Sequence, residues 1–437
     1  MIPSIKQDNR YHEGEDPSMT NERKIIILTC VAHFFTHFYE MIFPALAIPL
    51  MHSLDMPLAE VLRLSFLMYL LYGLTALPWG MVADRFTNRA ALIVFFGGTS
   101  LGAALTAFSD TPLSLMFSLA VIGFFASIYH PAGMGLISLG VRNRGMALGI
   151  NGVAGSLGLI SAPFAAGLLN WLVGWEITYL IIGGLGIIWG VVLFLVDIDE
   201  TPVHAEPEDT PSNPNSGNNN MRYFLILCVA MTIAGLVYRG NSVVLPAYLE
   251  LKASFLWDFF RGFDLPNMTG AKTVAATLLT SLIYLIGIMG QILGGKVADR
   301  YDLRWMYLAF HALSLPFVIL MSLVSQELLV LSAGLFIFFS LGMQPIENSL
   351  VAKYTPSRWR STGYGIKFIL TFGIGALAVY LVGWIKEAWD LATVYLFGGG
   401  LIVLLILSIV LLIRVSRGTI CRNRNEEQTP EQLEPTP

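Results

Sequence analysis

Three ionisable side chains occupy one face of the first long apolar run of the sequence. His33, His37 and Glu40 stand at positions i, i+4 and i+7, so an α-helix places them on the same side. An ionisable group deep in an apolar helix costs roughly 2.5–3.5 kcal/mol to insert into a membrane, and such groups generally face a cavity or a partner. A buried carboxyl beside two imidazoles is suited to taking up and passing on a proton. We therefore predict that Glu40, His37 and His33 carry protons.

Other apolar runs also contain single charged residues. His130, in SIYHPAG, is a fourth candidate for proton transfer, although a lone membrane histidine is more often a hydrogen-bonded structural residue. Arg239, in VYRGN, always keeps its charge and needs a counter-charge, which is either Glu40 or an anionic group on a ligand. Glu347 is expected in the same cavity, and Lys367 either reaches water or pairs with Glu347. Polar neighbours that can hydrogen-bond a ligand there are Tyr39, Tyr129, Asn241, Gln344 and Asn348.

The composition of the chain is that of a membrane protein. Of its 437 residues 55% are hydrophobic and 13% charged, and the mean hydropathy is +0.65. The three cysteines form no Cys-x-x-Cys pair, and the sequence contains no His-Glu-x-x-His motif, phosphate-binding glycine loop or nucleophile elbow. We expect no enzyme activity, no cofactor, no metal site and no nucleic-acid partner. The bilayer, a small solute and protons are the expected partners of a monomer.

Apolar runs long enough to cross a bilayer recur along the whole chain. We predict an all-α membrane protein with twelve transmembrane helices, six before and six after a polar segment. The predicted helices are 25–51, 61–83, 90–109, 113–138, 145–170, 177–197, 223–250, 273–298, 305–325, 328–353, 362–386 and 391–414. The corresponding regions are a tail at 1–24, a half at 25–197, a flexible linker at 198–222, a half at 223–414 and a tail at 415–437.

The distribution of basic residues predicts the orientation of the chain. The tails, the linker edge and the turns after even-numbered helices hold 19 of the 26 Lys and Arg residues. Only Arg63, Lys252, Arg261, Lys272 and Lys386 lie on the opposite side. By the positive-inside rule, the linker and the two terminal tails lie on the cytoplasmic side. We expect the protein in the plasma (bacterial inner) membrane.

The two halves repeat one another. Asp84, in GMVADRFTNRAAL, aligns with Asp299, in GKVADRYDLRWMY, at a shift of 215 residues, and Pro44 aligns with Pro246 at a shift of 202. Six spans per copy make the repeat parallel, with its pseudo-twofold axis along the membrane normal. Glu40 and Arg239 precede these two prolines by four and seven residues, about one helical turn apart in depth. We therefore predict an ion pair between them.

The repeated motif resembles the loop between helices two and three of the major facilitator superfamily. The matching residues are Gly80, Asp84, Arg85 and Arg89 in the first copy, and Gly295, Asp299, Arg300 and Arg304 in the second. The resemblance implies a conformational latch, in which arginines meet negative helix C-termini and the acid pairs with a positive N-terminus. The simpler alternative is that the charged residues of the motif only set the orientation of the chain in the membrane. The resemblance also implies a cavity lined by helices one, four, seven and ten, which are the helices that carry the buried charges.

A second resemblance lies in the expected helix five, GINGVAGSLGLISAPFAAG. Gly149, Gly158, Pro163 and Gly167 match a pattern of drug–proton antiporters of this superfamily, which implies a hinge with close helix packing. Packing alone also explains such glycines. Leu119 stands where those antiporters usually carry an arginine in helix four.

Together these patterns predict a secondary active transporter that works by alternating access. Proton-coupled export of a small organic solute is the first hypothesis, and proton-coupled uptake of an organic anion or amino acid is the alternative. A membrane sensor or a membrane-embedded enzyme is a remote alternative.

Overall fold

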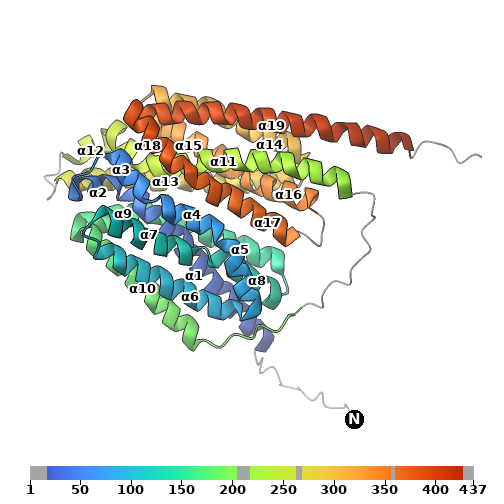
Figure 1. The fold of residues 1–437 in the computed structure, drawn as a ribbon, viewed down its shortest axis with the longest axis horizontal. Helices are drawn as coiled ribbons and strands as arrows, with labels where there is room; N and C mark the ends of the chain where they lie inside the picture. The colour runs from blue at the N-terminus through green and yellow to red at the C-terminus, as the bar shows by residue number, and fades with distance from the viewer. Residues whose placement is uncertain (1–16, 204–216, 262–267, 356–359, 427–437) are drawn as a thin grey trace, which may run out of the picture.

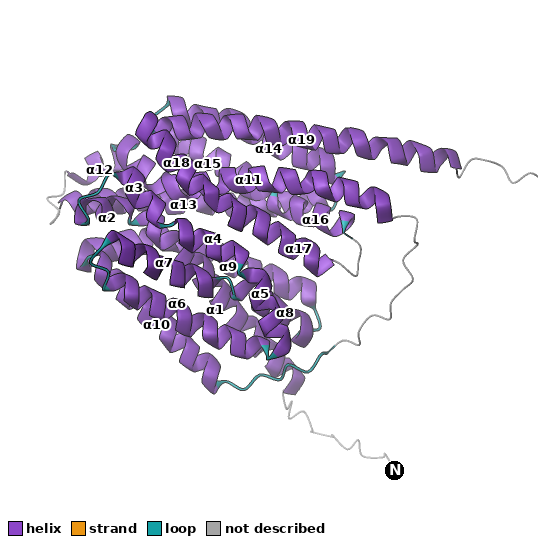
Figure 2. Cartoon of the chain, in the orientation of Figure 1, coloured by secondary structure: helices purple, strands orange, loops and turns teal. Residues whose placement is uncertain are grey.

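The computed structural model describes residues 17–203, 217–261, 268–355 and 360–426. Within these ranges the chain is helical and contains no strand (Figure 2). The first part of the chain forms α1 (Pro17–Ala45), α2 (Ala47–Ser53), α3 (Leu58–Leu64), α4 (Phe66–Leu74), α5 (Ala76–Arg85), α6 (Asn88–Ala107), α7 (Pro112–Ala126), α8 (Tyr129–Gly140), α9 (Arg144–Val173) and α10 (Trp175–Leu195).

The second part of the chain begins with a long helix and ends with another. It forms α11 (Gly217–Lys252), α12 (Phe255–Phe260), α13 (Met268–Ala298), α14 (Leu303–Leu323), α15 (Gln326–Gly342), α16 (Gln344–Tyr354), α17 (Arg360–Phe368), the π-helical turn Ile369–Gly373, the 3₁₀ turn Ile374–Ala376, α18 (Leu377–Ala388) and α19 (Leu391–Glu426).

The membrane-spanning helices are confirmed. In the described ranges, eleven helices are long and apolar enough to cross a membrane, and the pair Leu58–Leu74 and Ala76–Arg85, bent by 44°, makes a twelfth if it is counted as one span. Three helices run beyond the expected spans, because α1 starts at Pro17, α11 at Gly217 and α19 continues to Glu426. In these three helices, helical hydrogen bonding therefore extends beyond the apolar run into polar sequence. Of the expected flexible linker, 198–203 is a described segment without helix and 217–222 belongs to α11, while 204–216 lies outside the described residues, as do 1–16 and 427–437.

Several expected spans are broken, and proline accounts for two breaks. Pro131 in α8 and Pro345 in α16 lack the N–H that would bond the carbonyl four residues earlier, and α7 and α15 end close to those positions. The expected spans 113–138 and 328–353 are therefore each built from two helices. The two breaks occupy equivalent places in the two copies, which is consistent with the sequence repeat.

Two bundles lie side by side in Figure 1. Helices α1–α10 (blue to green) form one bundle, and helices α11–α19 (yellow-green to red) form the other. Across the boundary α9 packs against α13, α1 against α11, α4 against the π-helical turn, and α3 against α18. One cluster of buried residues extends over both bundles and includes Phe43, Tyr69, Val243 and Ile283, and a second cluster lies within the second bundle.

Candidate functional site

A buried ion pair joins the two bundles. Arg239 on α11 donates from Nη2 to Oε1 of Glu40 on α1 over 2.8 Å, and both side chains are almost fully buried. The guanidinium also lies 3.7 Å from the centroid of the Tyr69 ring on α4, in cation–π geometry. The ion pair predicted from the depths of the two residues is thus confirmed. Loss of one partner leaves the charge of the other partner buried and uncompensated. A charged ligand that binds one partner therefore changes the energy of the other.

Glu40 is held at two further points. Its second carboxylate oxygen, Oε2, lies 2.9 Å from Nδ1 of His37. Its backbone carbonyl accepts a hydrogen bond from the hydroxyl of Tyr69 over 3.0 Å. In an unbroken helix that carbonyl would bond the N–H of residue 44, but Pro44 has none. Pro44, which aligns with Pro246 in the repeat, therefore leaves the carbonyl of Glu40 free to accept from Tyr69. This hydrogen bond links α4 to the ion pair.

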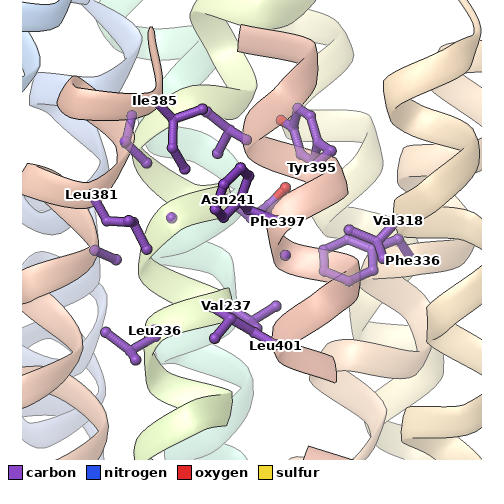
Figure 3. Close-up of a pocket in the computed structure, with 15 residues that line it drawn as sticks. Leu236, Val237, Asn241, Val318, Phe336, Leu381, Ile385, Tyr395, Phe397 and Leu401 are labelled. Carbon is purple, nitrogen blue, oxygen red and sulfur yellow. The ribbon is translucent and has the colours of Figure 1, made fainter. Parts of the chain in front are cut away.

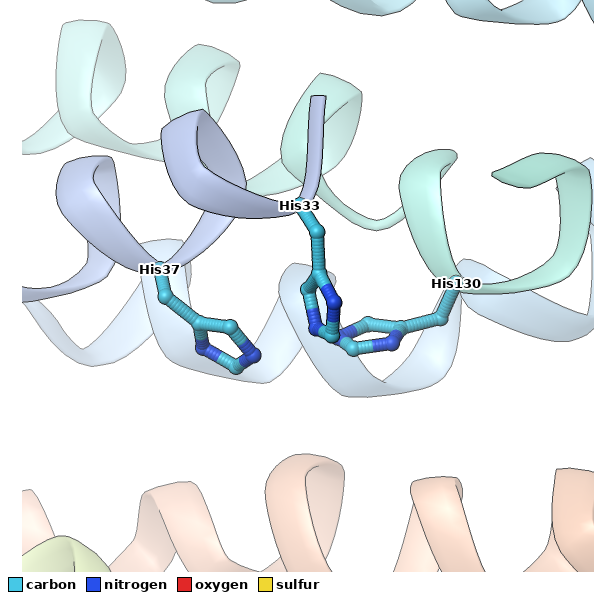
Figure 4. Close-up of side chains that lie close together, drawn as sticks. All are labelled: His33, His37 and His130. Atoms are coloured by element: carbon cyan, nitrogen blue, oxygen red, sulfur yellow. The ribbon is translucent and has the colours of Figure 1, made fainter. Parts of the chain in front are cut away.

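The three histidines from the sequence analysis lie together (Figure 4). The ring of His33 is centred 5.0 Å from that of His37 and 5.4 Å from that of His130, which is contributed by the first turn of α8. Tyr129 stacks on His33 with its ring centroid at 4.6 Å, and its hydroxyl donates to Asn151 on α9. Nε2 of His130 lies 3.0 Å from the hydroxyl of Tyr72.

A second buried ion pair lies inside the second bundle. Nζ of Lys367 lies 2.8 Å from Oε1 of Glu347 and donates to Oδ1 of Asn348 over 2.5 Å. The other carboxylate oxygen of Glu347 accepts from the hydroxyl of Tyr307 on α14. Of the two positions expected for Lys367, the structure therefore shows the pairing with Glu347.

Three predicted cavity residues lie apart from both ion pairs. Tyr39 points its hydroxyl toward the carbonyl of Ile182 on α10, so it packs within the first bundle. Gln344 accepts from Gln291, and Gln291 accepts from Ser156, which links α16, α13 and α9. Asn241 lines a mostly apolar pocket within the second bundle, where neither of its amide atoms has a hydrogen-bond partner among the described residues (Figure 3).

Three tyrosines that contact the ion pairs or the histidines were not predicted as site residues. Tyr69, Tyr72 and Tyr307 are buried and contact the charged groups or the histidines. Tyr69 matches Tyr284 at the same shift of 215 as the repeated motif, and that match was the available signal. Buried tyrosines are otherwise common in helix packing, so their type alone does not indicate a role.

Among the arginines of the repeated motif, Arg89 contacts the C-terminus of a helix, as the resemblance implies. Arg89 donates from Nε to the carbonyl of Leu193 and from Nη2 to that of Phe194, both in the last turn of α10. Arg304 donates to Ser416 on α19 and to Asp302. The hydrogen bonds from Arg304 lower the pKa of Asp302, which lies just outside the membrane span, to about 2.

The acids of the motif do not occupy the expected position in this conformation. Asp84 and Asp299 are exposed, and the side chain of neither makes a hydrogen bond or ion pair with another described residue. The carboxylate that meets the N-terminus of α6 is Glu200, which accepts from the backbone N–H groups of Asn88 and Arg89. Asp302 caps α14 by accepting from the N–H of Arg304. The expected caps are therefore made by acids outside the aligned positions: Glu200 comes from the segment after α10, and Asp302 comes from a later position of the second motif.

The remaining motif residues are glycines or exposed. Gly80 faces Pro131 on α8, Gly295 has open space around it, and Arg85 and Arg300 are exposed. On α9, Gly158 packs against the backbone of Phe34 on α1. Gly167 packs against Thr277 of α13, across the boundary between the bundles, while Gly149 faces open space and Pro163 is buried inside the helix.

Two apolar helical bundles with an ion pair buried between them define a membrane transporter of small solutes. The chain belongs to the Major Facilitator Superfamily, whose family model matches residues 28–263 and 227–436. It is 24% identical over 375 residues to the D-galactonate transporter of Escherichia coli O6:H1 (strain CFT073), covering 78% of this chain and 84% of the relative. It is 22% identical over 342 residues to riboflavin transporter RibZ of Clostridioides difficile (strain 630), covering 68% and 73%. These relatives are transporters, not enzymes.

Solved structures share the fold at low sequence identity. A bacterial homologue of the human lysosomal transporter Spinster, inward-facing and unoccupied, matches with a TM-score of 0.69 at 14% identity, covering 96% of this chain and 100% of that one. A POT family transporter in complex with 5-aminolevulinic acid matches with a TM-score of 0.68 at 14% identity, covering 89% and 96%. The likeness establishes the fold of this chain.

Proposed function

We propose that this chain takes up a small organic anion together with protons, by alternating access of its two halves, 25–197 and 223–414. The observation that carries the proposal is the Glu40–Arg239 pair, because it places a permanent cation and its exchangeable counter-ion between the two bundles. The named substrate of the D-galactonate relative is a carboxylate, which supports an anionic substrate here. The protein works as a monomer in the plasma membrane, with both termini on the cytoplasmic side.

The substrate carboxylate replaces Glu40 as the counter-ion of Arg239. A buried carboxylate without a counter-charge is costly, so the displaced Glu40 takes up a proton. The groups that face Glu40 are Arg239 from α11, His37 from its own helix and Tyr69 from α4. His37, His33 and His130 form the path by which the proton reaches Glu40. Lys367 and Glu347 bind the other end of the substrate with Asn348.

Proton-coupled export is the second candidate. The observation in its favour is α9, where Gly158 and Gly167 lie at close helix contacts as the antiporter-like pattern implies. In this mechanism the substrate and the proton compete for the cavity instead of binding together. The direction of proton movement during substrate flux separates the two candidates.

Reconstituted protein tests the proposal directly. Proteoliposomes are given a panel of small carboxylates, with D-galactonate as the first probe, and accumulation is measured with and without a pH gradient. Glu40→Gln should abolish gradient-driven accumulation and keep substrate counterflow, since an amide cannot exchange a proton. Arg239→Ala should weaken substrate binding by roughly 30-fold or more, the loss expected when a buried charge pair is truncated.

Glu176→Gln is the matched control, because Glu176 is an exposed acid at the start of α10. It should leave both readouts unchanged. Full gradient-driven accumulation by Glu40→Gln would refute the role of Glu40. Protons that leave the vesicles as the substrate enters would favour the antiport candidate.

A further inference from the structure

The nitrogen atoms of His33, His37 and His130 form a compact cluster. One ligand atom from each ring lies within 4.8 Å of the other two. His33 and His37 come from consecutive turns of α1, and His130 comes from the start of α8 (Figure 4). Nitrogens bound to one tetrahedral zinc ion lie about 3.3 Å apart, given Zn–N bonds of about 2.0–2.1 Å. The largest of these separations would therefore have to shorten by about 1.5 Å for the three nitrogens to share one ion.

The hydrogen bonds of two of the rings leave the correct nitrogen free. Nδ1 of His33 lies 2.8 Å from the backbone carbonyl of Asn151, which only accepts, so Nδ1 donates and Nε2 keeps its lone pair. Nδ1 of His37 faces the carboxylate of Glu40, which is ionised by its pairing with Arg239, so Nε2 of His37 is free as well. A histidine that donates one N–H to a carbonyl or carboxylate is the usual arrangement of a metal ligand.

The third ring carries an unsatisfied buried nitrogen. Nδ1 of His130 is buried and has no hydrogen-bond partner among the described residues, while Nε2 lies next to the hydroxyl of Tyr72. Nε2 is the nitrogen of His130 that faces the other two rings in Figure 4, so a bound metal ion would take the place of the Tyr72 hydroxyl at this atom. With Nε2 bound to the ion, Nδ1 of His130 would carry the ring proton, as Nδ1 does in the other two rings.

We propose that His33, His37 and His130 form a binding site for a divalent transition metal ion of the Zn²⁺, Co²⁺ or Ni²⁺ type. Neutral imidazoles suit these ions, whereas Mg²⁺ and Ca²⁺ prefer oxygen ligands. Three protein ligands leave the fourth position open for water or a carboxylate. The site stands beside the Glu40–Arg239 pair but does not depend on the identity of the transported solute. It revises the expectation that the chain has no metal site.

Metal binding to the purified full-length chain tests the proposal. The protein is prepared without a histidine tag, stripped with a chelator and titrated with Zn²⁺ by calorimetry, and with Co²⁺ by visible absorption. One equivalent of Zn²⁺ should bind, and Co²⁺ should give the intense d–d bands of a four-coordinate site. His33→Phe, His37→Phe and His130→Phe should each lower the affinity by more than about 100-fold, beyond the roughly 10–100-fold that loss of an outer partner usually costs.

His311→Phe is the matched control. His311 is also a buried histidine, but it lies on α14 against Tyr307 and outside the cluster. It should bind metal like the unchanged protein, and gel filtration of every variant checks that it is folded. If the folded triple variant His33→Phe/His37→Phe/His130→Phe still binds the same equivalent, or if the unchanged protein gives only the octahedral Co²⁺ spectrum, the site does not exist. Neither result bears on transport, so the two proposals fail separately.

Discussion

The buried pair of Lys367 and Glu347 shows how single residues balance one another in this protein. Lys367 has two acceptors, Glu347 and Asn348, while Glu347 has two partners, Lys367 and Tyr307. Each charge is therefore satisfied by one ionic and one neutral group. The loss of one ionic partner leaves a buried charge with only a neutral group, which is the unfavourable case.

A double-mutant cycle measures this balance. Lys367→Met should lower the free energy of unfolding by about 3–5 kcal/mol, because it leaves the Glu347 carboxylate unpaired. Glu347→Gln should cost less, because Lys367 keeps its bond to Asn348. Lys367→Met/Glu347→Gln should recover most of the loss, as measured by unfolding in detergent. Additive losses in the double variant would show that the two residues do not interact.

At the scale of the helix, α9 contacts both bundles through its glycines. Gly158 has no room for a Cβ beside the backbone of Phe34, and Gly167 has none beside Thr277. The first contact lies within one bundle and the second crosses between the bundles. In the proposed alternating access, contacts within a bundle persist, whereas contacts between the bundles form and break.

Three matched glycine substitutions separate these roles. Gly158→Ala should lower the amount of folded protein in the membrane, since a backbone atom cannot move aside. Gly167→Ala should keep the abundance and slow substrate flux, because it opposes the state in which α9 and α13 touch. Gly149→Ala, at a position facing open space, should change neither. Equal loss of abundance at Gly158 and Gly167 would contradict the distinction.

At the scale of the whole molecule, an exposed ion pair fastens the two bundles together at one end. Arg63 on α3 donates from Nη1 and Nη2 to the two carboxylate oxygens of Glu387 on α18, each over 2.6 Å. This end of the molecule also carries α2 and α12, as Figure 1 shows. The bidentate geometry fixes α3 against α18, so the two bundles cannot part here without breaking it.

Loosening this contact should shift the conformational equilibrium. Glu387→Gln should increase the population in which α3 and α18 are apart, measured as a longer distance between spin labels at positions 60 and 389. The charge reversal Arg63→Glu/Glu387→Arg should restore the short distance, because it rebuilds the pair in the opposite sense. An unchanged distance distribution in Glu387→Gln would mean that the pair does not hold this end closed.

The sequence alone determined the membrane class, the spans and the repeat. Long apolar runs must be helical in a bilayer, since every backbone polar group needs an internal partner, so hydropathy predicts the helices directly. The few charges within these runs pointed to the site for the same energetic reason. The Glu40–Arg239 pair was predictable because the repeat fixed the relative depth of the two helices.

The tertiary structure decided which side chains meet. The breaks at Ser127 and Met343, the cap that Glu200 gives to α6, and the position of Asn241 depend on helix rotation and on connecting segments, which hydropathy does not encode. The convergence of His130 on the two histidines of α1 likewise depends on how α8 packs. The sequence shows which residues share one face of a helix, but it does not show toward which neighbour that face is turned. A ligand site depends on distances between atoms of different helices. The periodicity of one chain segment therefore gave candidate residues, and packing between segments selected among them.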